Sequence, residues 1–563
     1  MQYYIGLSTS GHDPAFAIVD SNGYVIFAEA SERFFQSKRA WGIAPDHIDH
    51  IAPHLEKILK NDPAAVFYVS TSWTRAKQDL LGDGGSKLAE PSSALVSSNL
   101  GAWLLGIQAQ IHQKSGHNIR TVFQDHIGGA TMNFDHHLCH AANGVYSAPF
   151  KDGLVLVADG EGETGSISVY RLQKRTLKRL WRSWGPGSLG TFYCWLTSLC
   201  GFSWVAGEEW KVMGLAAYGT PDPDLLELLE RVLIIENGRP LLAEQSIIST
   251  VTETLFCHRR LPTEPVEKAA NLAATGQLAY QRYMNRIVAH LEKYKEENLI
   301  FCGGCALNSS YNGSLLSNSS FKQVHLPSAP ADDGNAIGAA LLAWNQVSGK
   351  KAIPSVEGAC YLGSLPDART IESTLNNSHW KSCRLPEGSP LKVAEQLAKG
   401  KIIGIFRGAA EFGPRALGHR SILADPRPEG MKDAINRQIK GREAYRPFAP
   451  MILEECQSEW FENAQDSPFM SFTLSFRADK THLVPAVVHA DGTGRLQTVN
   501  KLGDPWLYEL LQEFYRLTGV PIILNTSFNV MGKPIVHSVQ DAVAMFATTG
   551  LDGLLLKDVY FEK

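Results

Sequence analysis

The sequence has few cysteines, no long hydrophobic run and no visible export signal. Nine cysteines in 563 residues are too few for a disulfide-stabilised scaffold, so we expect a reducing, cytoplasmic location. No uninterrupted apolar segment approaches the roughly 20 residues that a bilayer-spanning helix needs. The amino terminus, Met1-Gln2-Tyr3-Tyr4, lacks a basic segment followed by an apolar one. We therefore expect no signal peptide and no membrane partner.

The chain also carries almost no net charge. Its 53 basic and 57 acidic residues give a formal charge of −4, which provides no general attraction to nucleic acids, and we expect no nucleic-acid partner. A content of 20% charged and 44% hydrophobic residues excludes a disordered, coiled-coil or collagen-like chain. Because single hydrophobic cores stop growing near about 250–300 residues, the length of 563 residues predicts two or three domains.

A pattern of three strands occurs twice in the first half of the chain. The β-prone segments, separated by polar turns, are 3–7, 16–19 and 24–27, and then 154–158, 166–172 and 178–184. Two such units about 150 residues apart indicate an internal duplication. The alternative is that any α/β enzyme contains hairpins of this kind.

Helical periodicity and one polar segment suggest how the chain is divided. Apolar residues recur at helical spacing in 48–59 and 272–294, and residues 335–346 have the alanine and leucine content of a packed helix. The segment that follows, residues 348–355, is polar and contains glycine and proline, which is typical of a linker. We therefore predict a first domain over residues 1–347 and a second over residues 356–563.

A histidine pair marks a candidate metal site. His136 and His140 are four residues apart, so on a helix they share one face and present both imidazoles to one ion. Asp159, at the end of an apolar strand, and Asp332, just before a helix, add two carboxylates, with Asp333 as a second candidate. This mixed nitrogen and oxygen set suits Fe, Mn or Zn. The alternative is a pair of surface or capping histidines.

Two glycines form a candidate phosphate site. Gly303 and Gly304 follow the apolar segment 299–301 and have no Cβ, which lets the backbone approach a phosphate at a helix amino terminus. Cys302 and Cys305 flank them, but one C-x-x-C pair cannot close a tetrahedral zinc site. We interpret these cysteines as packing residues.

Basic residues are concentrated in the second half of the chain. Six of them lie within 40 positions, among glycines and prolines: Arg407, Arg415, Arg420, Lys440, Arg442 and Arg446. Guanidinium groups on rigid loops suit bidentate capture of phosphates or carboxylates, and the alternative is salt bridges at a domain interface. Asn525, Ser527 and Asn529 follow an apolar strand, a position where open sheets bind ligands.

Together these motifs resemble those of the O-carbamoyltransferases of the nodulation-protein and antibiotic-biosynthesis type, which include the tobramycin, cephem and ansamycin carbamoyltransferases. They occur in the family's order from residue 5 to about 536: Gly11-His12-Asp13-Pro14-Ala15, Ser31-Glu32-Arg33-Phe34 with Lys38, His136-His137-Leu138-Cys139-His140, Asp159-Gly160-Glu161-Gly162-Glu163, Lys211-Val212-Met213-Gly214-Leu215-Ala216, Gly303-Gly304 with Asn308, Asp332, and the carboxyl-terminal set.

The resemblance implies an α/β fold and a two-step reaction. A duplicated actin-like ATPase (ASKHA) domain, similar to the tRNA threonylcarbamoyl transferase (Kae1-like) domain, would be followed by a smaller YrdC-like domain that forms carbamoyl-adenylate. Carbamoyl phosphate and ATP, with Mg²⁺, would give carbamoyl-adenylate. The first domain would then transfer the carbamoyl group to a hydroxyl of a small natural product, such as an aminoglycoside or a guanidinium alkaloid of the saxitoxin type. The oligomeric state stays open, with a homodimer as one option.

The resemblance also implies roles for individual residues. Fe²⁺ or another divalent transition metal would be held by His136, His140, Asp159 and Asp332, the last because the family's aspartate lies five residues before an apolar helical position, here Ile337. His12 would act in the transfer, as a base or as a donor to the carbamoyl oxygen, and Lys38 would contact phosphate. The expected nucleotide and carbamoyl-phosphate ligands are Gly303, Gly304, Asn308, Arg407, Arg415, Arg420, Lys440, Arg442, Arg446, Asn525, Ser527 and Asn529.

One position departs from the family, and three other functions compete. Lys533 stands where the family usually has an acidic residue, so any role of that position is in doubt. Threonylcarbamoylation of tRNA or carbamoylation of a protein thiol would use a related fold, but the chain has no strongly basic stripe and no paired zinc-finger motifs. A regulatory protein that binds a metal or a nucleotide without catalysis is the third alternative.

Overall fold

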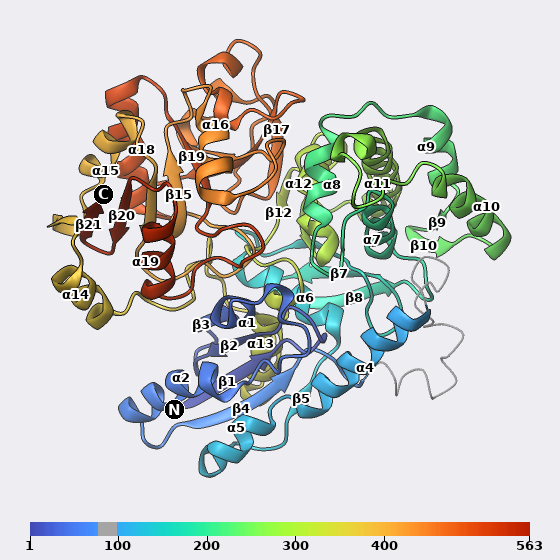
Figure 1. Ribbon diagram of the computed structural model, residues 1–563. Coiled ribbons are helices and arrows are strands. Elements are labelled where there is room, and N and C mark those ends of the chain that lie inside the picture. The colour runs from blue at the N-terminus through green and yellow to red at the C-terminus, as the bar shows by residue number, and fades with distance from the viewer. Residues whose placement is uncertain (77–97) are drawn as a thin grey trace. The chain divides into compact units, whose positions relative to one another are not determined.

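The computed structural model describes residues 1–76 and 98–563, which have a mixed α/β architecture (Figure 1). The chain divides into two compact units. Unit 1 comprises Met1–Asn308 and Leu315–Ala359, and unit 2 comprises Ser309–Ser314 and Cys360–Lys563. Part of the segment expected as a linker packs on unit 1, because Arg175 donates to the carbonyl oxygens of Ile353 (2.8 Å) and Pro354 (3.1 Å).

Unit 1 contains two five-stranded sheets with the same topology. Their strand orders are β3-β2-β1-β4-β5 and β8-β7-β6-β11-β12. In each sheet three antiparallel strands are continued by two parallel ones. The strands are β1 Gln2–Leu7, β2 Ala15–Val19, β3 Val25–Ala30, β4 Val66–Thr71, β5 Met132–Asn133, β6 Gly153–Ala158, β7 Ile167–Gln173, β8 Thr176–Arg182, β11 Asn298–Cys302 and β12 Gln323–His325. Both predicted three-strand units are therefore present, and their equal topology agrees with a duplication.

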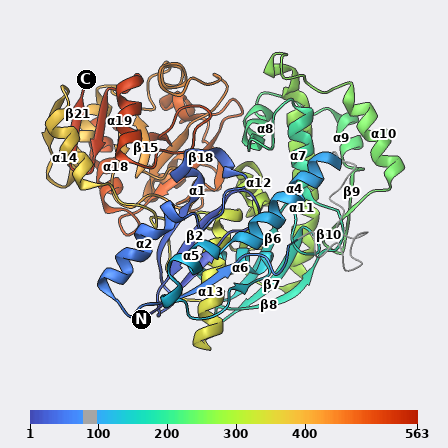
Figure 2. The same ribbon diagram turned by 60° about the horizontal axis from the view of Figure 1, so that its bottom comes forward.

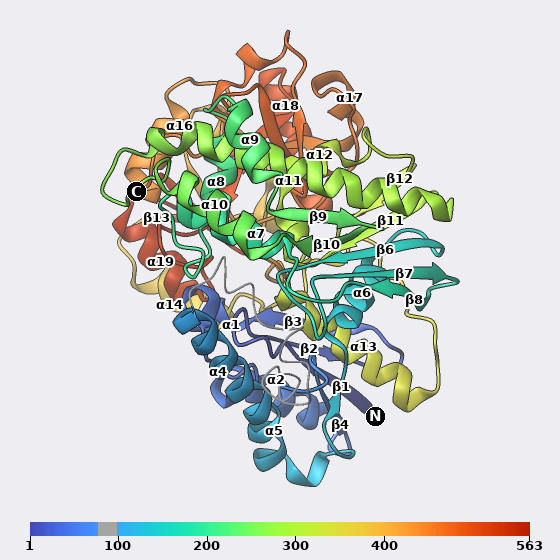
Figure 3. The same ribbon diagram turned by 90° about the vertical axis from the view of Figure 1, so that its right-hand side faces the viewer.

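Two helices lie between these sheets (Figure 3). Helix α13 (Asn335–Ser348) contacts β1, β2 and β4, helix α6 (His136–Ser147) contacts β6 and β11, and the two helices contact each other. Their close approach requires Gly338, because a Cβ there would lie 1.9 Å from the carbonyl oxygen of Cys139. The amino-terminal end of each helix carries candidate metal ligands, so this packing brings the ligands together.

Other helices cover the outer faces of unit 1. Ile51 and Leu55 of α2 (Ile48–Asn61) and Ile119 of α5 (His117–Val122) pack against β1 and β4 in one buried cluster (Figure 2). Helix α11 (Ala270–Leu291) contacts α7 (Leu189–Leu199) and α8 (Glu209–Ala216). The remaining elements are α1 Ser31–Phe35, α4 Ser98–Lys114, α9 Pro223–Leu229, β9 Leu233–Glu236, β10 Arg239–Leu242 and α10 Gln245–Phe256.

Unit 2 is built on a mixed sheet of nine strands in the order β13-β21-β20-β14-β15-β19-β16-β18-β17 (orange to dark red in Figure 1). Helices α15 (Pro390–Ala398) and α18 (Pro505–Thr518) pack together in its main hydrophobic cluster. The strands are β13 Lys381–Arg384, β14 Ile403–Phe406, β15 Arg420–Ala424, β16 Ala449–Leu453, β17 Phe472–Ser475, β18 Thr493–Val499, β19 Ile522–Ser527, β20 Gly553–Leu556 and β21 Val559–Glu562. The other helices are α14 Ala368–Asn377, α16 Met431–Ala434, α17 Gln457–Trp460 and α19 Val539–Thr548, and α12 Ser309–Leu315 begins in unit 2.

The structure confirms the helices expected at 48–59, 272–294 and 335–346, which are α2, α11 with its terminal turn, and α13. Hydrophobic periodicity identified α2 and α11, whereas α13 is apolar on nearly all sides because it lies between two sheets. Among the residues that the structure describes, none of the helices has the length and apolar character needed to cross a membrane.

Candidate metal centre and arginine cluster

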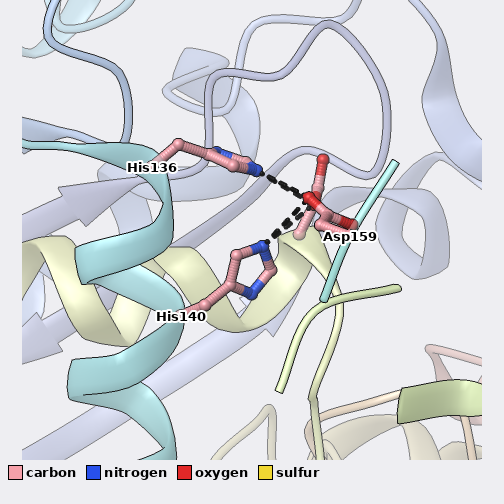
Figure 4. Close-up of side chains that lie close together, drawn as sticks. His136, His140 and Asp159 are labelled. Atoms are coloured by element: carbon pink, nitrogen blue, oxygen red, sulfur yellow. Dashed lines mark hydrogen bonds and ion pairs between the residues drawn. The ribbon is translucent and has the colours of Figure 1, made fainter. Parts of the chain in front are cut away.

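The start of helix α6 positions the histidine pair. Asp135 accepts a hydrogen bond from the backbone N–H of Leu138 (2.9 Å), and Glu163 accepts one from the backbone N–H of His136 (2.9 Å). These two carboxylates cap otherwise unpaired N–H groups in the first turn. The helix therefore begins at His136, and His140 follows one turn later on the same face. Figure 4 shows both imidazoles directed at Asp159.

Four side chains of unit 1 converge at this point. The Nε2 atom of His136 lies 3.0 Å from Asp159 Oδ2 and 3.5 Å from Asp332 Oδ1. The Nε2 atom of His140 lies 3.5 Å from Asp159 Oδ2 and 3.3 Å from Asp332 Oδ1. Each of the four residues offers one ligand atom, and these atoms all lie within 4.8 Å of one another. The sequence-predicted set is thus brought together as one buried cluster.

The electrostatics of this cluster suit a cation. Burial lowers the pKa of His136, but the charges of Asp332 and Asp159 outweigh it and raise the pKa to about 10. Burial raises the pKa of Asp332, but His136 and His140 outweigh it and hold that pKa well below its usual range. The same carboxylates would attract a divalent ion, which binds histidines in place of protons. The ring nitrogens of His140 make no hydrogen bond within the described structure, as expected for a ligand awaiting its ion.

Neighbouring groups orient the ligands. The Nδ1 atom of His136 lies 3.3 Å from the carbonyl oxygen of Ser72, and the indole of Trp73 stacks on its ring at 4.4 Å. This arrangement turns Nε2 toward the carboxylates. The backbone N–H of Gly304 donates to Asp159 Oδ1 (2.9 Å) and leaves Oδ2 facing the histidines. Such outer contacts fix ligand orientation in protein metal sites.

Asp332 and Asp333 have different environments. Asp332 belongs to the cluster, whereas Asp333 Oδ1 accepts a hydrogen bond from the backbone N–H of Gly334 (3.0 Å). Burial and the charges of Asp13 and Glu32 raise the pKa of Asp333 to about 7. The geometry therefore favours Asp332 as the fourth ligand.

His12 lies at the edge of the cluster. Its Nε2 atom is 3.7 Å from Asp332 Oδ2, and its Nδ1 atom is 2.9 Å from Asp13 Oδ2. The side chain is 26% exposed, so it is accessible to a substrate. Lys38 opens the short turn Lys38–Ala40, where its charge acts on Glu32. Its contact with phosphate stays a prediction.

The glycine pair and Asn308 are already engaged within unit 1. Gly303 has φ +90°, and a Cβ there would lie 2.2 Å from the carbonyl oxygen of Ala158, so only glycine fits. The amide of Asn308 exchanges two hydrogen bonds with Gln277, at 3.1 and 3.0 Å. A short 3₁₀ turn, Gly304–Leu307, follows the glycines rather than a full helix. Phosphate binding by these residues stays a prediction.

In unit 2, four arginines influence one another. Burial is the main cause that lowers the pKa of Arg495, and the charges of Arg415, Arg442 and Arg446 lower it further. Burial lowers the pKa of Arg415 to about 10, and burial together with Arg446 lowers that of Arg442 to about 9. One carboxylate, Glu443, lies 3.6 Å from Arg446. Partly buried arginines that outnumber the nearby carboxylates are typical of a site for an anionic ligand.

Arg495 was not among the residues predicted from the sequence. It lies on β18, two positions after Thr493 and two before Gln497, so the three side chains share one face of the sheet. No sequence signal separates it from a structural arginine in a strand, because Arg420 on β15 is also buried and donates to carbonyl oxygens.

Lys440 lies beside Ser527 and Asn529. Its ammonium donates to the Asn529 carbonyl (3.0 Å) and Oδ1 (2.9 Å) and to the Ser527 carbonyl oxygen, and it lies 3.3 Å from Ser527 Oγ. A π-helical turn, Ile435–Lys440, precedes it, and such turns are frequent at functional sites. Lys440, Ser527 and Asn529, all predicted from the sequence, therefore lie together at one site.

The remaining predicted residues have structural partners. Arg407 pairs with Asp504 and lies over the ring of Trp506. Arg420 donates to the carbonyl oxygens of Arg407 (2.6 Å) and Ser364 (2.8 Å). The Asn525 amide donates to Gln497 (2.7 Å) and Ala416 (3.2 Å), while its Oδ1 is buried without a hydrogen bond in the described structure. The engaged guanidiniums of Arg407 and Arg420 fit a role in holding the loops better than one in binding phosphate.

The chain has matches among known proteins. A family model described as carbamoyltransferase N-terminus matches residues 3–341, and one described as carbamoyltransferase C-terminus matches residues 394–563. The chain therefore belongs to the carbamoyltransferase family, and it is an enzyme.

Individual relatives agree with this membership. The chain is 33% identical to nodulation protein NolNO of Sinorhizobium fredii over 99% of its own length and 80% of the relative's. It is 35% identical to nodulation protein NolO of Bradyrhizobium diazoefficiens over 75% and 77% of the two lengths. A solved structure of full-length HypF in the phosphate- and nucleotide-bound form aligns with 62% of this chain and 47% of that one, at 12% identity and a TM-score of 0.37.

Proposed function

We propose that this carbamoyltransferase makes carbamoyl-adenylate from carbamoyl phosphate and ATP in unit 2 and transfers the carbamoyl group to a hydroxyl of a small natural product in unit 1. The observation that carries the proposal is the arginine cluster of Arg415, Arg442, Arg446 and Arg495. Both substrates of the first step are phosphate anions, and excess buried cations hold and neutralise such groups during phosphoryl chemistry.

The first step, formation of carbamoyl-adenylate, has two stages. Water cleaves carbamoyl phosphate into carbamate and phosphate. A carbamate oxygen then attacks the α-phosphorus of ATP, and the bond to pyrophosphate breaks. Guanidinium groups would stabilise the charge that moves to the departing phosphates. Lys440, whose ammonium donates to Ser527 and Asn529, would hold these two residues in place for the nucleotide. Mg²⁺ would accompany ATP as it does in related phosphoryl transfers.

The second step needs an activated carbamoyl group because a hydroxyl is a weak nucleophile. The acceptor oxygen attacks the carbamoyl carbon, the bond to AMP breaks, and the hydroxyl proton must leave. His12 stands beside the cluster with its Nε2 atom toward it, which suits general-base catalysis or donation to the carbamoyl oxygen. His136, His140, Asp159 and Asp332 would hold Fe²⁺ or another divalent transition metal, which supplies Lewis acidity when bound.

The folds proposed for the two units follow the same assignment. The equal topology of the two sheets of unit 1 supports a duplicated actin-like domain. The mixed sheet of unit 2, with its arginine cluster, supports a carbamoyl-adenylate-forming domain of the YrdC-like type. The acceptor is proposed only by class, as a hydroxylated small molecule such as an aminoglycoside or a saxitoxin-type alkaloid.

The test combines two measurements. Purified enzyme with ATP, carbamoyl phosphate, Mg²⁺ and Fe²⁺ is assayed for pyrophosphate release, and a panel of hydroxylated metabolites is then analysed by mass spectrometry. We expect pyrophosphate release that requires carbamoyl phosphate, and a gain of one carbamoyl group on the acceptor. Absence of carbamoyl-phosphate-dependent pyrophosphate release would refute the first step. Tight, salt-sensitive binding of tRNA in a shift assay would favour a nucleic-acid substrate instead.

A further inference from the structure

We propose that Arg39 is a positioning residue for the transfer reaction, because it holds His12 and joins the His12 turn to the segment before helix α8. This inference rests on the proposed role of His12 in carbamoyl transfer. All of the residues that carry it belong to unit 1.

The Arg39 guanidinium holds the Nδ1 side of His12. Its Nη2 atom lies 3.0 Å from His12 Nδ1 and 2.9 Å from Asp13 Oδ2, and its Nε atom lies 3.2 Å from the same carboxylate oxygen. Asp13 Oδ2 in turn lies 2.9 Å from His12 Nδ1. Nδ1 makes one of these hydrogen bonds at a time, as the donor to Asp13 Oδ2 when it carries the proton or as the acceptor from Arg39 Nη2 when it does not. In both cases the imidazole presents Nε2 to a substrate, on the side where Asp332 lies. Because Arg39 also binds the Asp13 carboxylate, it holds the ring in either form. When one nitrogen of an imidazole is held by a hydrogen bond, the direction of the other nitrogen is fixed as well.

The backbone around this contact is strained. Asp13 has φ +48° and Arg39 has φ +57°, and Ala40, next to Arg39, has φ +40°. Residues with a Cβ in this left-handed region cost of order 1–3 kcal/mol each and occur mainly where the surroundings hold them for a functional purpose. Here a hydrogen bond from the Asp13 N–H to the Arg39 carbonyl oxygen (2.8 Å) joins the two strained residues. The two turns therefore form one unit around His12.

Arg39 also reaches the segment that leads into helix α8. Its Nη1 atom donates to the carbonyl oxygen of Trp204 (3.2 Å) and lies 3.9 Å from Glu209 Oε1. Trp41 makes a parallel contact, because its indole N–H donates to the carbonyl oxygen of Val205 (2.8 Å). The His12 turn follows β1 of the first sheet, whereas Trp204 and Glu209 follow α7 beyond the second sheet. Arg39 thus joins the two halves of unit 1 at the edge of the metal-type cluster, together with Trp41.

This geometry predicts what loss of Arg39 changes. Lysine has one ammonium in place of a planar group with five donors, so no other side chain replaces the contacts to Asp13, His12 and Trp204 together. A displaced catalytic group slows the chemical step more than it weakens substrate binding. We expect Arg39→Ala to lower kcat for transfer at least about 50-fold and to change KM for the acceptor less than about threefold. Guanidinium ion added at millimolar concentration should restore part of the rate.

A chemical probe tests the position of His12 without an acceptor. Diethyl pyrocarbonate modifies accessible imidazoles, and peptide mass spectrometry gives the rate at each histidine. In Arg39→Ala we expect His12 to react at least about fivefold faster, because Nδ1 loses a partner, while the exposed His482 reacts unchanged. Arg231→Ala removes an exposed arginine of unit 1 and is the matched control.

The outcomes separate this inference from the proposed function. Equal His12 modification in wild type and Arg39→Ala would overturn the inference even where the enzyme is fully active. A carbamoyl-transfer rate in Arg39→Ala equal to that of wild type would also overturn the inference. Failure of the wild-type enzyme to release pyrophosphate would overturn the proposed function and leave the modification result valid. Pyrophosphate release by Arg39→Ala within about twofold of wild type shows that the variant is folded and that unit 2 works.

Discussion

Replacing Arg495 with methionine should stabilise unit 2 while abolishing its chemistry. The Arg495 guanidinium is placed among Arg415, Arg442 and Arg446, and its Nε atom is buried without a hydrogen bond in the described part of the chain. A buried charge without a counterion opposes folding, and a ligand anion reverses that cost. Methionine keeps much of the side-chain volume and removes the charge.

The size of the effect follows from the neighbouring arginine. Burial lowers the pKa of Arg415 from 12.5 to about 10. At about 1.36 kcal/mol per pKa unit, keeping this group protonated in the folded state costs about 3 kcal/mol at neutral pH. The cost is present at every pH below about 10 and fades above it, because the unfolded chain then binds more protons. Removing one of four such charges should recover about 1–3 kcal/mol, or roughly 2–10 °C in Tm.

Scanning calorimetry with and without pyrophosphate provides the measurement. Wild type should gain Tm on adding pyrophosphate, whereas Arg495→Met should start higher, gain little, and release pyrophosphate from ATP at least about 100-fold more slowly. Arg437→Met, which removes an exposed arginine of the same unit, is the control and should match wild type in all three respects. A variant that melts lower than wild type without ligand, or that keeps the full pyrophosphate-induced gain, would refute the reasoning.

Three further predictions concern unit 1. His136→Ala should abolish carbamoyl transfer and leave pyrophosphate release within about twofold, whereas equal loss of both would contradict separate sites. Asp332→Asn should weaken metal binding at least about 10-fold in an equilibrium titration, and Asp333→Asn should not, because Asp333 lies outside the cluster. Gly303→Ala should lower the free energy of unfolding by at least about 2 kcal/mol in urea, since its Cβ would lie 2.2 Å from a carbonyl oxygen and φ is +90°; an unchanged midpoint would argue against this tight turn.

Sequence reasoning succeeded where a signal was local. The helices and repeated strands follow from the spacing of apolar residues, and His136 and His140 share a face because they are four residues apart. Asp159 and Asp332 were added because one ends an apolar strand and the other precedes a helix, and the family resemblance favoured Asp332 over Asp333. The fold explains the convergence by packing α6 against α13. Sequence spacing could not distinguish structural arginines from those of the cluster, however. Arg420 and Arg415 differ by five positions, yet one is saturated by carbonyl oxygens and the other belongs to the cluster with Arg495.

Arg39 was overlooked for a different reason. Its neighbour Lys38 was chosen because it occurs in a family motif, but the conformation that turns Arg39 toward His12 has φ +57°, which no pattern of residue types reveals. Its other partners, Trp204 and Glu209, lie far away along the chain and reach it only through the packing of unit 1. Long-range contacts made by one side chain leave no periodic trace in a single sequence.

The near-zero net charge of the chain conceals two local clusters of charged residues, one in each unit. Unit 1 gathers two carboxylates at a site whose histidines carry protons in the absence of an ion, and unit 2 gathers four arginines with one nearby carboxylate. The first site offers imidazoles and carboxylates that would suit a divalent cation, and the second offers guanidinium groups that would suit phosphate groups. Averaged over 563 residues, these opposite excesses fall within a total of −4.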